Sequence, residues 1–161
     1  MEKEVKQKST LEERVIRVRR VFTVVKGGRR IGFNALIVVG DRKGKVGLSL
    51  GKAKDLMGAI EKARRKAEKN LIFVPIKDGT ISHWIQAKFR ASCVLLKPAS
   101  PGTGLIAGPT VRAIVELAGI ENILSKSLGS NNPLNAAKAT VKALGMLRSP
   151  REIFELRGRK G

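Results

Sequence analysis

The chain has 161 residues, of which 33 are Lys or Arg and 13 are Asp or Glu, so its formal net charge is +20. The apolar fraction of 42% is that of a folded protein, and the length suffices for one medium domain or two small ones. Because so basic a globule repels itself, a polyanion such as nucleic acid, or an anionic membrane surface, is the expected partner.

Membrane and secreted classes are excluded by the sequence pattern. The longest apolar run, residues 35–39, is far shorter than the ~20 residues of a membrane span. The first residues have no apolar signal core, and their glutamates are unlike a transit peptide. A single cysteine, Cys93, rules out an internal disulfide framework. We therefore expect a cytoplasmic protein, or one made inside an organelle, without a membrane partner.

The first half predicts a basic strand-rich unit. Residues 1–10 are an extension, and residues 11–25 begin as a helix and pass into a strand of alternating apolar and basic residues. The paired glycines of KGGRR predict a turn, and the stretches 31–40 and 45–50 flank DRKGK as a hairpin. The segment VPIKDGT carries Pro and Asp-Gly turn signals, so we place a domain boundary there, between 11–75 and 76–161.

Residues 55–70 predict a helix with two opposed faces. At 100° per residue its apolar stripe is Leu56, Ile60, Ala63 and Ala67. The opposite side gathers Lys62, Arg65, Lys66 and Lys69. Such a face is either solvated or laid against phosphates, and the overall charge favours phosphates.

The second half predicts β-α-β-α, which follows α-β-β-β-α in the first half, so the fold class is α+β. Residues 83–95 alternate as one long strand whose shared face is His83, Ile85, Ala87, Phe89, Ala91, Cys93 and Leu95. A helix over 110–118 ends at Gly119, and residues 120–128 form a short strand. Asn132 caps a helix that starts at Pro133, and a capping box at Ser149 starts a last short helix before a basic tail.

Enzyme chemistry finds little support. On one continuous strand His83 and Cys93 would lie about 33 Å apart, at ~3.3 Å per residue, so they could not act together. One His and one Cys cannot build a zinc or iron centre, so we expect no metal and no cofactor.

The glycine-rich stretch 98–109, which opens a helix, could cradle a phosphate. It matches neither a P-loop nor a dinucleotide fingerprint. PGTGLIAG resembles the phosphate loop of the galactokinase and homoserine-kinase superfamily, but Ile106 and Ala107 replace its serines, and no acidic cluster is nearby to hold magnesium. We expect no small-molecule substrate.

The motifs VKGGRRIGF, VVGDRKGKVG, LGKA, KPASPGTGLIAG and GSNNPLNAAKAT, in this order and spacing, resemble the bacterial-type small-subunit ribosomal protein S-five family. The resemblance runs over about residues 11–158. It implies a domain similar to double-stranded-RNA-binding domains, and then a domain of the fold that the kinases share. It also implies a structural protein that binds 16S-type rRNA, in a bacterial or organellar ribosome, and does no chemistry. The lack of Tyr and the few Phe agree, since double-stranded RNA is recognised through phosphates rather than stacking rings.

The resemblance also assigns roles to residues. The loop toward an rRNA helix near the neck of the subunit, close to the spectinomycin site, is Lys26, Gly27, Gly28, Arg29 and Arg30. The phosphate contacts outside the loop would be Arg17, Arg19, Arg20, Arg42, Lys43, Lys45, Lys52, Lys54, Lys62, Arg65, Lys66 and Lys69, with mRNA near its channel as a possible ligand of the first three. An interface with ribosomal protein S-four that influences decoding accuracy would contain Gly102, Gly104, Gly108 and Arg112. Protein S-eight is a further expected neighbour.

Two alternatives and one departure remain open. The loop could be a hairpin tip with solubilising charge only, and the chain could be a free-standing double-stranded RNA-binding module or RNA chaperone. Pro109 stands where the family usually has glycine, and it removes one N–H.

Overall fold

The computed structural model describes residues 11–158. The first half contains β1 (Glu12–Val25), β2 (Gly28–Gly40), β3 (Lys45–Ala53), α1 (Leu56–Lys69) and β4 (Leu71–Phe73). The second half contains β5 (Ile76–Lys77), β6 (Thr80–Ile81), β7 (Ile85–Phe89), β8 (Ser92–Pro98), β9 (Leu105–Ile106), α2 (Pro109–Ala118), β10 (Ile123–Gly129), α3 (Pro133–Gly145) and α4 (Pro150–Leu156). The predicted α+β class is confirmed.

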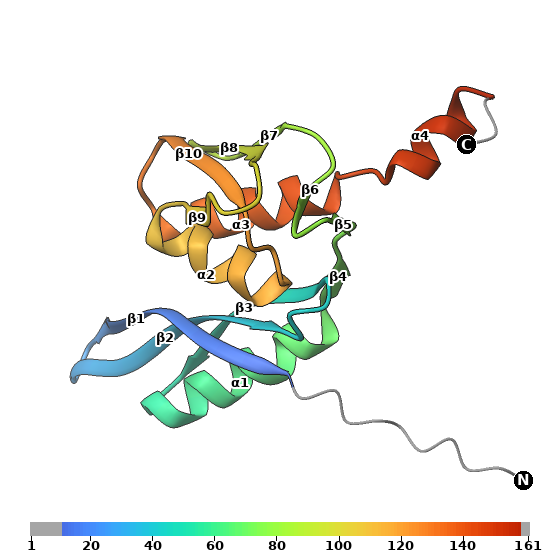
Figure 1. Cartoon of the computed structure of the whole chain (residues 1–161). Coiled ribbons are helices and arrows are strands. Elements are labelled where there is room, and N and C mark those ends of the chain that lie inside the picture. The colour runs from blue at the N-terminus through green and yellow to red at the C-terminus, as the bar shows by residue number, and fades with distance from the viewer. Residues whose placement is uncertain (1–10, 159–161) are drawn as a thin grey trace, which may run out of the picture.

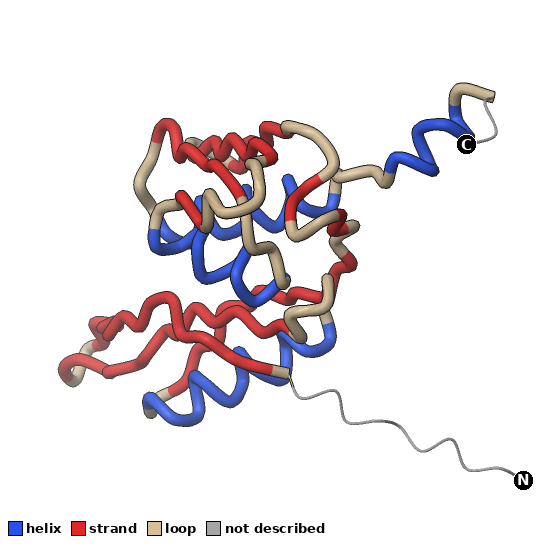
Figure 2. Tube along the Cα trace, in the orientation of Figure 1, coloured by secondary structure: helices blue, strands red, loops and turns tan. Residues whose placement is uncertain are grey.

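The elements stack in four layers (Figures 1 and 2). Helix α1 covers one face of the sheet β1-β2-β3-β4, and α2 and α3 lie on its other face, beneath the second sheet β7-β8-β10-β9. Helix α4 projects from the body at the end of the described chain. The helices α2 and α3 therefore lie between the two sheets.

Alternation along β2 divides its side chains between two apolar clusters. Ala35, Ile37 and Val39 pack against α1, whereas Leu36 and Val38 join the larger cluster beneath α2 and α3. That larger cluster takes buried residues from both halves of the chain. The two faces of one strand thus hold α1 and the second half in place.

The predicted helix over residues 55–70 is confirmed, with a shifted apolar stripe. Asp55 caps it by accepting a hydrogen bond from the N–H of Gly58 at 2.6 Å. Its buried residues are Ala59, Ala63 and Ala67. Leu56, predicted to be on the buried stripe, is 40% exposed, because the face of α1 that meets the sheet runs through Ala59, Ala63 and Ala67.

The predicted helix at the start of 11–25 is wrong within the described residues. Strand β1 begins at Glu12, which pairs with Gly40 of β2. The glutamates read as a helical start instead form ion pairs, Glu12 with Arg42 of the turn after β2 and Glu13 with Arg64 of α1. Pairing with β2 satisfies the backbone of these residues, and no local propensity outweighs it.

The predicted single strand over 83–95 is also wrong. Residues 85–98 form the hairpin β7–β8, in which Phe89 pairs with Ser92 and Arg90 has a φ of +52°. The turn reverses the alternation, so Ala87 is buried in β7 while Val94 and Leu96 are buried in β8. A continuous 13-residue strand would span about 43 Å at ~3.3 Å per residue, longer than the ~20 Å of the helix α3 that covers it.

The remaining predicted turns, helices and strand in the second half are confirmed. Gly119 ends α2 with a φ of +92°, and Asn132 caps α3 by accepting from the N–H of Leu134. The Asp78–Gly79 turn closes the β5–β6 hairpin, with a positive φ at both residues. Helix α4 is observed after Ser149, while the last three residues of the predicted basic tail lie outside the described residues.

The two halves meet backbone to backbone. The N–H of Arg42 donates to the carbonyl of Leu117 at 3.0 Å, and the N–H of Gly44 donates to that of Ala118 at 2.9 Å. A Cβ on Gly40 would overlap the Leu117 carbonyl oxygen, and one on Gly119 would overlap that of Arg42. We call this contact the backbone seam; it exists only because no side chain stands at either glycine.

The seam predicts a stability loss in the variant Gly40→Ala. The added methyl would come within 2.9 Å of the Cβ of Leu117, so the halves must separate or shift. We expect a cost of about 2 kcal/mol and a melting temperature lower by roughly 4–8 °C. Thermal unfolding of Gly27→Ala is the matched control, since nothing lies within 4 Å of a Cβ there. Equal melting temperatures for the two variants would contradict the seam.

Candidate nucleic-acid interface

The β1–β2 hairpin extends past the neighbouring strand as a two-stranded arm (Figure 1). Its pairing runs on to Val25 and Gly28, whereas β3 ends its pairing with β2 at Phe33. The exposed large apolar residues of the arm are Val21, Phe22, Val24, Val25 and Ile31. An arm with exposed apolar and basic residues is a surface suited to contact with a partner rather than a core element.

The tip of the arm is open on all sides. Lys26, Arg29 and Arg30 are exposed and have no carboxylate within 4 Å among residues 11–158. Gly28 has a φ of +133°, and a Cβ at either Gly27 or Gly28 would meet nothing within 4 Å. Both the cations and the backbone of this turn can therefore be approached closely by phosphates.

The second turn, residues 41–44, lies at the other end of β2. Asp41 orders it by accepting from the N–H groups of Lys43 at 2.7 Å and Lys45 at 3.0 Å. Arg42 pairs with Glu12 at 2.7 Å and belongs to the backbone seam. Lys43 and Lys45 are exposed, so of the three cations predicted here Arg42 has a structural role as well.

The outer face of α1 is basic, and it points away from the second half. Lys62, Lys66 and Lys69 are exposed, while Arg65 forms an ion pair with Glu61. The hydrogen bond that Arg64 donates to Glu68, together with the charges of Glu13 and Glu68, raises the pKa of the Arg64 guanidinium. Lys52 and Lys54 are exposed just before α1, where Lys52 pairs with Asn34 of β2. Lys54 and the cations of α1 form one surface on the α1 side of the sheet, whereas Lys52 lies on the opposite face, in line with Leu48 and Leu50.

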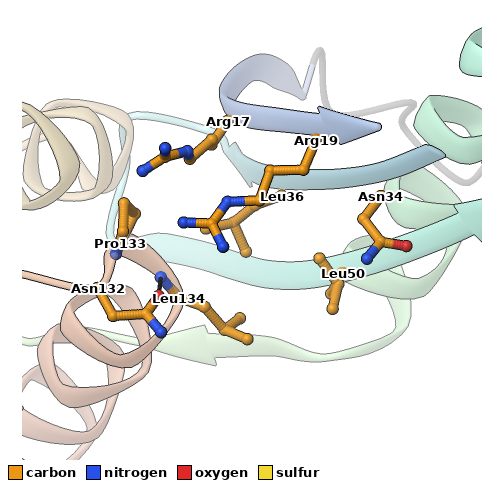
Figure 3. Close-up of a pocket in the computed structure, with 8 residues that line it drawn as sticks. All are labelled: Arg17, Arg19, Asn34, Leu36, Leu50, Asn132, Pro133 and Leu134. Carbon is orange, nitrogen blue, oxygen red and sulfur yellow. Dashed lines mark hydrogen bonds between the residues drawn. The ribbon is translucent and has the colours of Figure 1, made fainter. Parts of the chain in front are cut away.

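The three arginines of β1 are divided between the two faces of the strand. Arg17 and Arg19 line a pocket on the face that meets the second half, next to Asn132 and Pro133 at the start of α3 (Figure 3). Arg20 stacks on Phe22, with 4.8 Å from its guanidinium carbon to the ring centroid. The predicted group of Arg17, Arg19 and Arg20 is therefore not one surface.

The glycine-rich stretch 98–109 is fixed by its own hydrogen bonds. The N–H of Gly104 donates to Oδ1 of Asn122 at 3.0 Å, and the guanidinium of Arg112 donates to the carbonyl of Leu105 at 2.9 Å. Gly102 and Gly104 have φ values of +88° and +73°. Two of the groups that could hold a phosphate are thus occupied.

Pro109 is the first residue of α2, with Gly108 as its N-cap. The N–H that proline lacks is one that the first turn of a helix leaves without an intrahelical partner. Proline at position 109 is therefore compatible with the helix. Beside the loop is a groove of about 590 Å³, which Arg42, Gly104 and Arg112 border.

The remaining candidates for chemistry lie apart. Cys93 pairs with Lys88 across the β7–β8 hairpin and accepts from the side chain of Gln86 at 3.0 Å, while His83 precedes β7. Because these residues belong to a hairpin, the separation predicted for a continuous strand does not apply. Among the described residues no group of His, Cys, Asp or Glu could hold a metal ion. Likewise no helix within 11–158 is long and apolar enough to cross a membrane.

The sequence missed the residues that complete the pocket at Arg17. Asn34, Asn132 and Leu134 line it, but they come from different halves of the chain. The period-two spacing of Arg17 and Arg19 places them on one face of a strand, and this much can be read from the sequence. That the start of α3 would lie opposite them depends on the backbone seam, which no local pattern indicates.

Comparisons with known proteins agree over nearly the whole chain. Residues 11–75 match the family model "Ribosomal protein S5, N-terminal domain" and residues 87–157 match "Ribosomal protein S5, C-terminal domain". A Thermotoga neapolitana protein named small ribosomal subunit protein uS5 is 53% identical over 151 residues, 94% of this chain and 85% of that one. Proteins of the same name from Treponema pallidum and Nostoc punctiforme are 52% and 49% identical, over 91% and 95% of this chain and 86% and 88% of theirs.

The hydrogen bond at Gly104 predicts a specific effect of Asn122→Ala. The side chain of Asn122 is buried, and its loss frees the loop amide. We expect a stability loss of about 1–3 kcal/mol and faster hydrogen exchange at the Gly104 amide, measured by NMR. Asn131→Ala is the control, because Asn131 is exposed and has no side-chain hydrogen bond within the described chain. Unchanged protection of the Gly104 amide in Asn122→Ala would show that this bond does not fix the loop.

Proposed function

The chain belongs to the ribosomal protein S5 family, and from this premise we propose that it is a structural constituent of the small ribosomal subunit that binds rRNA through its basic surfaces. The observation that carries the proposal is that both family domains match, and that relatives named as small-subunit proteins cover more than nine-tenths of the chain. The protein is not an enzyme, as its close relatives are ribosomal proteins. Because these bacterial relatives are ribosomal proteins, the location of the chain is the cytoplasmic ribosome.

The first rRNA contact in this proposal is the tip of the β1–β2 arm. Its support is physical: three exposed cations without carboxylate partners, and two glycines that leave the backbone open. Phosphates are acceptors for Lys and Arg, and a glycine turn lets them come within hydrogen-bond distance of the backbone. The arm is also long enough to reach beyond the body of the protein, as Figure 1 shows.

The second contact is the α1 side of the first sheet. The residues that would meet phosphates there are Lys54, Lys62, Lys66 and Lys69, with Arg65 in an ion pair that RNA can replace. Lys52 would meet phosphates on the opposite face of the sheet. A surface ion pair contributes about 0–1 kcal/mol, so its exchange for a phosphate costs little. Lys43 and Lys45 would extend RNA binding to the opposite end of the sheet.

The third part of the proposal is an interface with the neighbouring protein S-four at the stretch 98–109. Its support is the groove beside Arg42, Gly104 and Arg112, and the exposed loop glycines whose Cβ positions are empty. A loop held by Asn122 and Arg112 offers a fixed shape to a partner, and in this proposal the contact influences decoding accuracy. Contact with protein S-eight, and with mRNA near its channel, belongs to the same proposal.

The domain division at residue 75 is likewise proposed. The family models match the two stretches separately, although the larger apolar cluster draws on both.

The test of the proposal is co-sedimentation with ribosomal subunits after a high-salt wash. We expect the tagged chain to stay in the small-subunit peak at one copy per subunit. Reversal of the arm charges, Lys26→Glu with Arg29→Glu, should reduce incorporation at least tenfold. The matched control is Lys97→Glu with Lys126→Glu, two exposed lysines on the second sheet. Equal effects of the two pairs would contradict the arm contact. Loss of the unmutated chain into the top fractions would favour the free-standing RNA-binding module.

A salt titration tests the phosphate contacts directly. If about eight phosphates are neutralised, the log of the affinity for transcribed small-subunit rRNA should fall with log salt at a slope of about −6 to −7. Filter binding at roughly 50 to 400 mM potassium chloride, a range around physiological salt, measures this slope. A flat dependence would rule out binding through phosphates.

A further inference from the structure

A groove runs between strand β1 and the N-terminal ends of α2 and α3. Its narrow part is a pocket of about 110 Å³ (Figure 3), and its wide part has about 640 Å³. Arg17 and Pro133 border both, so the two parts are continuous. We call it the interdomain groove and define it by Arg14, Arg17, Arg19, Asn34, Arg112 and Asn132.

Unpartnered positive charge is concentrated in the narrow part. Arg14 forms an ion pair with Glu116, and Arg112 donates to the Leu105 carbonyl. Arg17 and Arg19 have neither a hydrogen bond nor a carboxylate within 4 Å among residues 11–158. Figure 3 shows both guanidinium groups extended over the pocket toward the start of α3. Two like charges held side by side in this way favour an anion between them.

The sheet holds these two arginines in place. Beyond the irregularity between Val15 and Arg17, Arg17 lies opposite Leu36 of β2 and Arg19 lies opposite Asn34. Leu36 in turn lies opposite Leu50 of β3. The floor of the pocket is therefore a row of cross-strand neighbours, so the arginines stand on a rigid apolar base.

The helix side of the groove is positive as well. Helices α2 and α3, of 10 and 13 residues, begin there, and neither has an acidic residue in its first turn. Their dipoles therefore add positive potential that no carboxylate in the first turn of either helix offsets. This potential reinforces the two arginines.

The size and composition of the pocket limit the ligand. Pockets for small metabolites have roughly 300–1,000 Å³, and this one has about 110 Å³. It admits one phosphate-sized group, while the wide part leaves room for the adjoining nucleotide. The leucines beneath the arginines suit the apolar edge of a ribose. Walls on both sides exclude a regular duplex, whose phosphates lie on a broad convex surface.

We propose that the interdomain groove binds an RNA strand outside a regular duplex, with one phosphate held between Arg17, Arg19 and the N-terminal end of α3. The inference rests on the proposed function, since that function supplies the RNA. It adds a phosphate site separate from the arm tip and from the α1 face. The planar fork of arginine matches two phosphate oxygens, which lysine cannot do.

The test is fluorescence anisotropy of the full chain with a labelled single-stranded uridine oligonucleotide. We expect Arg17→Gln with Arg19→Gln to weaken binding at least tenfold. At about 0.7 per phosphate of a single strand, the loss of this one phosphate contact would make the salt slope shallower by about 0.7. The matched control is Lys97→Gln with Lys126→Gln, which removes the same charge from the second sheet. Because Arg17 and Arg19 are exposed and unpartnered, the melting temperature of their double variant should equal that of the parent.

Cross-linking locates the strand on the protein. With 4-thiouridine in the oligonucleotide, we expect cross-linked peptides from residues 14–20 and 131–135. Cross-links confined to residues 26–30, or equal affinity of the arginine and control variants, would overturn the groove. Two further results would also overturn it: an equal loss of affinity for a duplex RNA, and stronger competition by poly-glutamate than by RNA. None of these results would change the co-sedimentation of the chain with the small subunit. The groove inference can therefore fail while the proposed function stands.

Discussion

The backbone seam between residues 40–44 and the end of α2 is the contact on which the other features depend. Two interhalf hydrogen bonds of 3.0 and 2.9 Å join main chains that side chains normally keep apart. Gly40 and Gly119 permit this approach, and Gly119 also supplies the left-handed residue that ends α2. With the turn held against α2, the upper face of β2 and β3 is covered by helices, and both halves contribute to one apolar cluster. The orientation of α2 and α3 relative to β1, and hence the groove, follows from this contact.

Local patterns predicted most elements because local chemistry determines them. Capping by Asp55 and Asn132, the left-handed Gly119 and the glycine turn of the arm each involve residues within a few positions. Two predictions failed where distant contacts decide. The alternation through 83–95 continues across Arg90, which has neither the glycine nor the proline of an ordinary turn, so only pairing and the length of α3 reveal the hairpin. At Glu12, pairing with β2 and the ion pair with Arg42 replace a helical start.

The same distinction applies to the candidate interface. Charge and glycine spacing indicated the arm and the basic face of α1, because each is one contiguous stretch whose exposed side follows from its period. The β1 arginines form no such unit: Arg17 and Arg19 face α3, and Arg20 lies over Phe22. Arg42 was predicted as a phosphate contact and also has a carboxylate partner. Exposed cations therefore lie on several sides of the first half rather than on a single face.

The glycine-rich stretch 98–109 leads into α2, and the turn 130–133 leads into α3. The two turns differ in which polar groups remain free to bind a ligand. At 98–109 the amide of Gly104 is taken by Asn122 and the guanidinium of Arg112 by Leu105, so the phosphate-loop likeness of this stretch is one of shape. At 130–133 the side-chain oxygen of Asn132 accepts from the N–H of Leu134. Arg17 and Arg19, which line the same pocket, have no hydrogen-bond or carboxylate partner within the described chain. An anion held by Arg17 and Arg19 would therefore displace no existing bond of these arginines, whereas one in the glycine-rich loop would have to break two. This difference favours phosphate binding at the start of α3 and a protein contact at the loop, although the loop carries the more familiar motif.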